Sequence, residues 1–168
     1  MDFTAIKLLI LDVDGVLTDG RLLIGPDGER TKTFHVHDGC ALKLWHRSGG
    51  HSAVLSSRAS AALDLRAHEL GISLVRAGVP EKVAGYEAIL KEGAFIDAQV
   101  AYVGDDLPDL PVMARVGLPI AVAQAVPAVK KRATYVTARR GGQGAVAEVV
   151  ELLLRKQRRW SGPMLTEP

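Results

Sequence analysis

The chain has 168 residues, of which 48% are hydrophobic and 24% are charged, and its formal net charge is +2. This length suits one globular domain, and no apolar run approaches the roughly 20 residues that a membrane-spanning helix needs. The weak net charge, and a basic cluster at 155–159 that lacks interleaved aromatic residues, indicate that neither a membrane nor a nucleic acid is a partner.

The first predicted element is a strand buried on both faces, because residues 6–11 are apolar except for Lys7 and show no alternation. An acidic residue stands before it where a secretory signal would carry basic ones, so we expect no targeting segment. Similar runs recur at 52–55, 73–75, 100–103, 118–122 and 134–136, and helical patterns lie at 41–47, 59–70, 81–91, 109–115, 127–131 and 145–156. This alternation predicts an α/β fold, with a Rossmann-like three-layer arrangement of a parallel sheet and helices on both faces.

One stretch breaks the alternation and predicts a β-hairpin inserted after the first strand. Residues 20–24 and 31–36 have strand patterns, and the segment Gly25-Pro26-Asp27-Gly28 between them has strong turn chemistry. We therefore expect one domain over residues 1–159, with a hairpin flap at about 20–36. A C-terminal tail follows over residues 160–168, where one Gly and two Pro disfavour regular structure.

Five residues near the end of the hairpin suggest local roles. His35 and His37 alternate on the predicted second strand and so share a face, where a structural or interface role is favoured over a metal pair because no third soft ligand stands nearby. Asp38 and Gly39 are expected to cap the following helix. Cys40 is the only cysteine, which excludes a disulfide within the chain and favours a buried thiol in a reducing cytoplasm.

An acidic loop follows the first strand. Asp12 and Asp14 stand two residues apart at its carboxyl end, which is where ligands bind in open α/β sheets. Burying two carboxylates is costly unless a cation or hydrogen bonds compensate, and Gly15 permits a turn that other residues resist. A solvated acidic turn is the alternative. A helix-loop-helix calcium site is excluded, because Val16 and Leu23 occupy its fifth and twelfth ligand positions.

Further polar residues stand where later strands are expected to end. Because parallel strands end at one edge of their sheet, we expect these residues to meet the acidic loop there. One carboxylate can attack phosphorus, a second can transfer protons, Mg²⁺ can offset charge repulsion, and a hydroxyl and an ammonium can hold phosphoryl oxygens. The pattern therefore predicts magnesium-dependent phosphoryl transfer by Asp12 and Asp14 with Ser56, Lys82, Asp105, Asp106 and Asp109.

These motifs resemble those of the haloacid dehalogenase-like superfamily of phosphohydrolases, in the same order along the chain. Asp12 to Val16 is similar to the first motif, Ser56 to the second, Lys82 to the third and Gly104 to Asp109 to the fourth. Longer stretches are similar to the 3-deoxy-D-manno-octulosonate 8-phosphate phosphatase family, at residues 11–20, 102–106 and 141–146. The similarity extends over nearly the whole chain, roughly residues 6–154.

The resemblance implies a role for each matching residue. Asp12 is implied as the nucleophile and a Mg²⁺ ligand, Asp14 as the general acid/base with its backbone carbonyl on the metal, and Asp105 as the third ligand. Asp106 and Asp109 are implied to support the metal site, and Ser56 and Lys82 to bind the phosphoryl group. The candidates for contact with the rest of the substrate are Arg58, Arg66, Asp38 and Gly39.

The resemblance also implies a substrate and an assembly. The substrate would be a sugar-acid phosphate monoester such as 3-deoxy-D-manno-octulosonate 8-phosphate, used in lipopolysaccharide biosynthesis or another pathway of keto-sugar acids. Members of the family lack a cap domain and form homotetramers in which the hairpin and the C-terminal tail help to close a neighbouring active site. The short hairpin here, with no insertion of cap size, agrees with that arrangement.

Three positions depart from the family pattern. Ser57 stands where the family usually has Gly, Gln124 where it usually has an acidic residue, and Ala147 where it usually has Arg. These departures leave the exact substrate open. A nine-carbon sugar-acid 9-phosphate or another small phosphate ester is the alternative within the same chemistry.

Two other classes of protein are alternatives to a phosphatase. A phospho-receiver domain uses similar residues, but its phosphoacceptor Asp ends the third strand and its Ser/Thr and Lys follow, whereas Ser56 and Lys82 here precede Asp105. A non-catalytic oligomeric module of the same fold is disfavoured because all the carboxylates that the catalytic motifs require are present.

Overall fold

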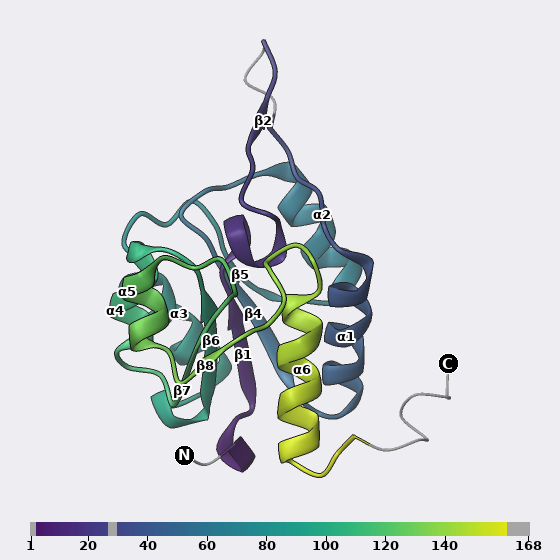
Figure 1. Ribbon diagram of the computed structural model, residues 1–168, viewed down its shortest axis with the longest axis vertical. Coiled ribbons are helices and arrows are strands. Elements are labelled where there is room, and N and C mark those ends of the chain that lie inside the picture. Colours follow the sequence, from purple (N-terminus) through teal and green to yellow (C-terminus); the bar gives the residue numbers. More distant parts are fainter. Residues whose placement is uncertain (1–2, 27–29, 161–168) are drawn as a thin grey trace.

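Parallel strands form the central sheet, in the order β5-β4-β1-β6-β7-β8 (Figure 1). The computed structural model describes residues 3–26 and 30–160. The strands are β1 (Leu8–Leu11), β4 (His51–Leu55), β5 (Leu74–Arg76), β6 (Val100–Gly104), β7 (Leu118–Ala121) and β8 (Tyr135–Val136). The predicted parallel sheet is confirmed, and each of the strands predicted for it begins and ends within two residues of an observed strand.

The first strand lies at the centre of the sheet because it is apolar on both sides. All four residues of β1 are fully buried, and the strand pairs with β4 on one edge and β6 on the other. Leu8 aligns with His51 and with Val100 in this register. From β1 the chain adds β4 and β5 on one side of the sheet, and then β6, β7 and β8 on the other. The loops that follow β1, β4 and β6 therefore lie together at the carboxyl edge of the sheet, where ligands usually bind in such folds.

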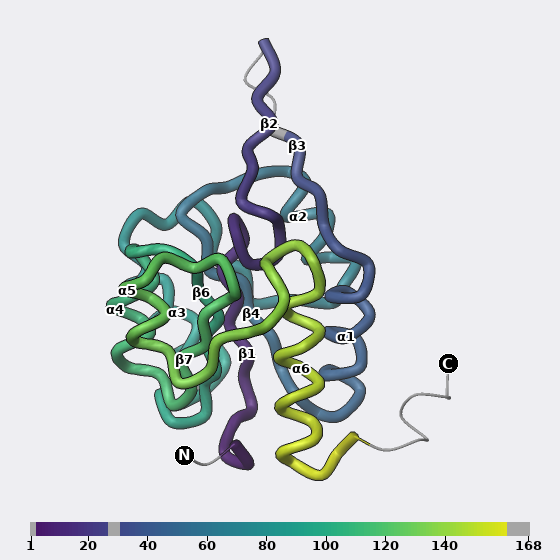
Figure 2. The backbone as a smooth tube through the Cα atoms, viewed as in Figure 1, coloured from purple at the N-terminus to yellow at the C-terminus, as the bar shows by residue number. Residues whose placement is uncertain are grey.

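Helices cover both faces of the sheet, as predicted (Figures 1 and 2). One layer contains α1 (Val36–Arg47), α2 (Ala61–Leu70) and α6 (Ala145–Lys156). The other contains α3 (Lys82–Gly93), α4 (Leu110–Met113) and α5 (Pro127–Arg132). Short helical turns connect these elements at Phe3–Ala5, Val13–Leu17, Asp97–Gln99 and Leu107–Asp109.

Helix α1 begins earlier than its sequence pattern indicated, which corrects two predictions. Asp38 and Gly39 do not cap α1 but lie within its first turns, and the buried Asp38 Oδ1 accepts a hydrogen bond from the Ala147 N–H at 2.8 Å instead. Asp38 therefore caps α6, whose own N-cap residue, Gly144, has no side chain to do so. Cys40, predicted to be buried, is exposed on α1 because the apolar stripe of that helix runs through Leu42 and Trp45.

The hairpin projects beyond the sheet (Figure 2). It consists of β2 (Leu23–Ile24) paired antiparallel with β3 (Arg30–Thr31), so its strands are shorter than predicted. His35 and His37 are not on a strand: His35 is the N-cap residue of α1 and His37 lies in its first turn, with the two ring centroids 4.9 Å apart.

Some predictions concern residues outside the described ranges. Part of the predicted turn at 25–28 and all of the predicted tail except Trp160 lie there, so the domain limits stay predictions. Within residues 3–26 and 30–160, none of the helices has both the length and the apolar character for crossing a membrane.

Candidate active site

The loops at the carboxyl edge of the sheet enclose a cavity of about 360 Å³. Each motif predicted from the sequence contributes to its wall: the loop after β1, the loop after β4, the start of α3 and the loop after β6. The lining residues are Asp12, Asp14, Gly20, Leu22, Ser56, Ser57, Arg58, Lys82, Asp105, Asp106, Pro108 and Asp109.

The loop after β1 is held in an irregular turn by glycine and by internal hydrogen bonds. Gly15 adopts φ +94°, a left-handed conformation that favours glycine. The Thr18 hydroxyl accepts from the Gly15 N–H at 3.3 Å and the Gly20 N–H at 3.2 Å, and it donates to the Val13 carbonyl at 3.3 Å. The buried Thr18 side chain thus fixes the segment that carries Asp12 and Asp14.

Lys82 lies between two buried carboxylates. Its Nζ is 2.7 Å from Asp12 Oδ1 and 2.6 Å from Asp109 Oδ1, and the lysine is only 6% exposed. Burial by itself lowers the pKa of Lys82, but the charges of Asp12 and Asp109 outweigh it, so the pKa lies above its ordinary value. The ammonium therefore stays charged at the floor of the cavity.

Asp109 organises the loop after β6. Its Oδ1 accepts from Lys82 and from the Tyr102 hydroxyl at 2.7 Å, and its Oδ2 accepts from the N–H groups of Asp105 at 2.8 Å and Asp106 at 3.2 Å. Burial raises the pKa of Tyr102 well above its ordinary value, so its hydroxyl remains a donor. These four bonds use the accepting capacity of the Asp109 carboxylate within the protein.

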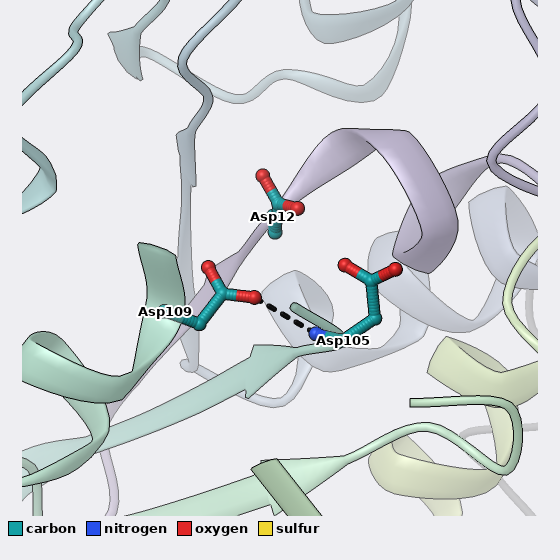
Figure 3. Close-up of side chains that lie close together, drawn as sticks. All are labelled: Asp12, Asp105 and Asp109. Carbon is teal, nitrogen blue, oxygen red and sulfur yellow. Dashed lines mark hydrogen bonds between the residues drawn. The ribbon is translucent and has the colours of Figure 1, made fainter. Parts of the chain in front are cut away.

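Three carboxylates form an acidic cluster, with oxygen atoms of Asp12, Asp105 and Asp109 within 4.8 Å of one another (Figure 3). The Asp105 Oδ1 atom is buried and has no hydrogen-bond partner in the described part of the chain. Burial, together with neighbouring carboxylates, raises the pKa of Asp105 to about 8 and that of Asp12 to about 6. A hard cation such as Mg²⁺ would stabilise these buried carboxylates, because it offsets the repulsion between their negative charges.

The acidic cluster fits Mg²⁺ through two of its members. Asp105 offers the unpartnered Oδ1, and Asp12 lies beside it at the end of β1 (Figure 3). Asp109 is within reach of the same point, but its oxygens are already engaged by four donors, which suits a supporting position better than ligation. Asp106 is exposed and accepts from the Leu107 N–H at 2.8 Å, so its side chain shapes the loop.

The Asp14 carboxylate lies outside the acidic cluster and faces two cations. Its Oδ1 pairs with the Lys32 ammonium, and its Oδ2 is 3.7 Å from Arg58 Nη1. Lys32 follows the hairpin and its side chain is 2% exposed, whereas Arg58 is about half exposed at the mouth of the cavity. Sequence reasoning missed Lys32, because a single lysine after a hairpin has no spacing pattern that marks it.

Ser56 and Ser57 form the wall of the cavity at the end of β4. Ser56 is buried, and its Oγ accepts from the Arg58 N–H at 3.2 Å. Ser57 stands where the family resemblance leads us to expect glycine, yet its backbone does not adopt a positive φ and its side chain is exposed. The extra Cβ therefore causes no backbone strain here.

The other candidates for substrate contact do not line the cavity. Arg66 pairs with Glu69 at 2.7 Å and stacks over Phe34, in a separate shallow depression between the hairpin end and α2. Gly39 packs against Arg66, where a side chain would collide with the guanidinium. The Oδ1 atom of Asp38 is hydrogen-bonded to the first turn of α6.

Comparison with known proteins agrees with this geometry. A family model described as haloacid dehalogenase-like hydrolase matches residues 63–150. The chain is 43% identical over 157 residues to the 3-deoxy-D-manno-octulosonate 8-phosphate phosphatase KdsC of Yersinia pestis, which covers 94% of this chain and 84% of that protein. It is 45% identical over 152 residues to the protein of the same name from Escherichia coli strain K12, covering 90% and 81% respectively.

Solved structures are similar over almost the whole chain. The cobalt-bound deoxy-D-mannose-octulosonate 8-phosphate phosphatase of Haemophilus influenzae has a TM-score of 0.95 at 37% identity, covering 99% of this chain and 100% of that chain. The 3-deoxy-D-manno-octulosonate 8-phosphate phosphatase of Moraxella catarrhalis, in complex with a magnesium ion, a phosphate ion and a KDO molecule, has a TM-score of 0.91 at 38% identity, covering 95% and 91%.

Proposed function

Because this chain belongs to the 3-deoxy-D-manno-octulosonate 8-phosphate phosphatase family of haloacid dehalogenase-like hydrolases, we propose that it is a magnesium-dependent phosphatase for that sugar-acid phosphate. The main support for the proposal is that two carboxylates line the same cavity but form ion pairs with different side chains. Asp12 is held by Lys82 beside Asp105, and Asp14 is held apart by Lys32 and Arg58. A nucleophile and a separate proton carrier are thereby available to one phosphate ester.

In the first step Asp12 acts as the nucleophile. With a pKa of about 6, its carboxylate is mostly ionised at neutral pH. An oxygen of Asp12 forms a bond to phosphorus, the ester P–O bond breaks, and the leaving sugar oxygen takes a proton from Asp14. The Lys82 ammonium and the Ser56 hydroxyl contact the phosphoryl oxygens in this scheme, since both line the cavity beside Asp12.

In the second step the aspartyl-phosphate is hydrolysed. The Asp14 carboxylate takes a proton from water, the water oxygen attacks phosphorus, and the bond to Asp12 breaks, which releases phosphate, restores the Asp12 carboxylate and leaves Asp14 protonated for the next cycle. Mg²⁺ held by Asp12, Asp105 and the Asp14 backbone carbonyl would offset the repulsion between carboxylate and phosphate. Asp109 supports this arrangement by holding Lys82 and the loop of Asp105, and Asp106 shapes the same loop.

Arg58 is the proposed contact for the carboxylate of the sugar acid. It is about half exposed at the mouth of the cavity, and a guanidinium recognises carboxylates in a planar, bidentate manner. Arg66, Asp38 and Gly39 lie away from this cavity in the described chain, so any substrate role for them would involve the site of a neighbouring copy.

The decisive experiment measures phosphate release with and without Mg²⁺ across a panel of phosphate monoesters. The panel contains 3-deoxy-D-manno-octulosonate 8-phosphate, a nine-carbon sugar-acid 9-phosphate and common sugar phosphates. We expect magnesium-dependent turnover concentrated on the first. Preference for the nine-carbon ester would reassign the substrate and keep the chemistry. A folded protein that binds Mg²⁺ but turns over no member would support the non-catalytic module.

We further propose that the enzyme is a cytoplasmic homotetramer. Large apolar side chains are exposed on the hairpin and near its end, where another copy could cover them, namely Leu22, Leu23, Ile24, Val36 and Leu65. Light scattering of the full chain tests the assembly, with a Leu23→Asp variant expected to weaken it. A fully active monomer would remove the shared active site from the proposal, and cell fractionation tests the location.

A further inference from the structure

A single side chain, that of Gln124, connects two loops of the active-site edge. Its Nε2 donates to the Gly15 carbonyl at 2.5 Å, and its Oε1 accepts from the Gly141 N–H at 2.9 Å. We propose that Gln124 is a positioning residue for the Mg²⁺ site, because it sets the loop of Asp12 and Asp14 at a fixed distance from Asp105. This inference rests on the proposed function, since it concerns the metal that function requires.

Gly15 is the point where the first loop contacts Asp105. A Cβ at Gly15 would overlap the carboxylate of Asp105, so the backbone of one segment packs directly on the side chain of the other. The Gly15 N–H is bonded to Thr18 within the same loop, whereas the Gly15 carbonyl is bonded to Gln124, which follows β7. The hydrogen bond to Gln124 therefore connects this loop to the segment that follows β7.

The segment that carries Gln124 also holds the backbone of Asp105. The Val126 N–H donates to the Asp105 carbonyl at 2.9 Å, and the Val122 N–H donates to the Gly104 carbonyl at 3.3 Å. Residues 122–126 thus contact both segments that carry the proposed ligands. The segment is itself anchored, because the Ala123 N–H donates to the Thr137 hydroxyl at 3.1 Å.

The loop at residues 141–142 also contacts Gly15 and its neighbour Val16. A Cβ at Gly141 would overlap the Gly15 carbonyl, so the two backbones are in direct contact. The Gly142 N–H donates to the Val16 carbonyl at 3.0 Å. Gln124 therefore bridges Gly15 and Gly141 at a place where both backbones are already close.

An amide is the side chain that satisfies both partners. It has an oxygen for the Gly141 N–H and an N–H for the Gly15 carbonyl, whereas an ionised carboxylate can only accept. A carboxylate at this position therefore could not donate the bond to Gly15.

The test measures Mg²⁺ affinity by titration calorimetry on the full, metal-free chain. Gln124→Met removes both hydrogen bonds, and Gln124→Glu removes only the donor to Gly15. Gln143→Glu is the matched control, because it adds the same charge on an exposed side chain two residues after Gly141. We expect the Kd for Mg²⁺ to rise about 3- to 10-fold in both Gln124 variants, the loss of one or two ordinary hydrogen bonds, and to stay unchanged in Gln143→Glu.

A second readout separates positioning from general stability. If Gln124 positions the metal site, raising the Mg²⁺ concentration restores phosphate release in the Gln124 variants, and their unfolding temperature without metal stays near that of the wild type. A wild-type Kd in Gln124→Met would overturn the inference while leaving the proposed function intact. If Gln124→Met fails to fold, the Kd of Gln124→Glu decides by the same criterion. A wild-type chain that binds no Mg²⁺ would overturn the proposed function, and the inference with it.

Discussion

The Lys32 ammonium forms an ion pair with the Asp14 carboxylate, although the two residues lie on opposite sides of the hairpin in the sequence. The Lys32 side chain is almost completely buried, so the pair is shielded from water. Asp14 is the proposed general acid/base, and Lys32 is therefore the residue that orients it. Through this pair the position of the hairpin is linked to the proposed chemistry.

The first prediction concerns Lys32. Lys32→Met keeps most of the side-chain volume but removes the charge, and a hydrogen bond to a charged group contributes about 1.5–3 kcal/mol. We expect kcat/KM to fall about 10- to 100-fold, with Lys32→Arg retaining more activity than Lys32→Met. Lys91→Met, on the exposed last turn of α3, is the control. Equal activity of Lys32→Met and wild type would show that Asp14 needs no such partner.

The second prediction concerns the two carboxylates at the end of β1. Asp12→Asn should abolish turnover, because a neutral amide cannot form the aspartyl-phosphate. Asp14→Asn should lower kcat by about 10²–10⁴, the usual contribution of acid/base assistance. Circular dichroism would verify the fold, and steady-state phosphate release would measure the effect. Wild-type turnover by Asp12→Asn would refute the proposed nucleophile.

The third prediction concerns the metal. Because the acidic cluster brings Asp12 and Asp105 together at a buried position, Mg²⁺ should stabilise the folded chain. At about 100 times the Kd, the stabilisation is about 2.7 kcal/mol, which thermal unfolding with Mg²⁺ or with a chelator would detect as a rise in Tm. Asp105→Asn should lose most of this rise. A Tm independent of Mg²⁺ in the wild type would contradict binding at this cluster.

The fourth prediction is a pH dependence of stability that arises away from the active site. Burial, with a smaller effect of His51, lowers the pKa of His46, whose Nε2 lies 2.6 Å from Ser52 Oγ. The unfolded chain, with an ordinary histidine pKa near about 6.5, then binds more protons than the folded one. The contribution of His46 is therefore present above about pH 6.5 and is lost as the pH falls from there toward the folded pKa.

Thermal unfolding of a variant measures this contribution. The Tm of His46→Gln should fall less than that of the wild type between about pH 7.5 and about pH 5.5. His68→Gln, at an exposed position on α2, should behave like the wild type. The same fall in Tm for His46→Gln and wild type would assign the pH dependence to other groups.

Local patterns predicted most of the fold. The apolar run before Asp12 marked a strand covered on both faces, and in the structure all of β1 is buried. The predictions were wrong where a strand-like pattern runs into a helix that begins earlier than its own pattern indicates. Residues 31–36 had a strand pattern, but β3 ends at Thr31 and α1 begins at Val36, which places Asp38 against α6.

By itself the sequence determined the order of the strands and helices and the residues that stand at the strand ends, because hydrophobic periodicity and motif spacing are local properties. Only the tertiary structure decided which side chains face one another. The buried bonds of Asp109, the pair of Lys32 with Asp14, and the bridge from Gln124 to Gly15 all join residues distant in the chain. Such contacts depend on how separate elements pack, which no single segment of the sequence encodes.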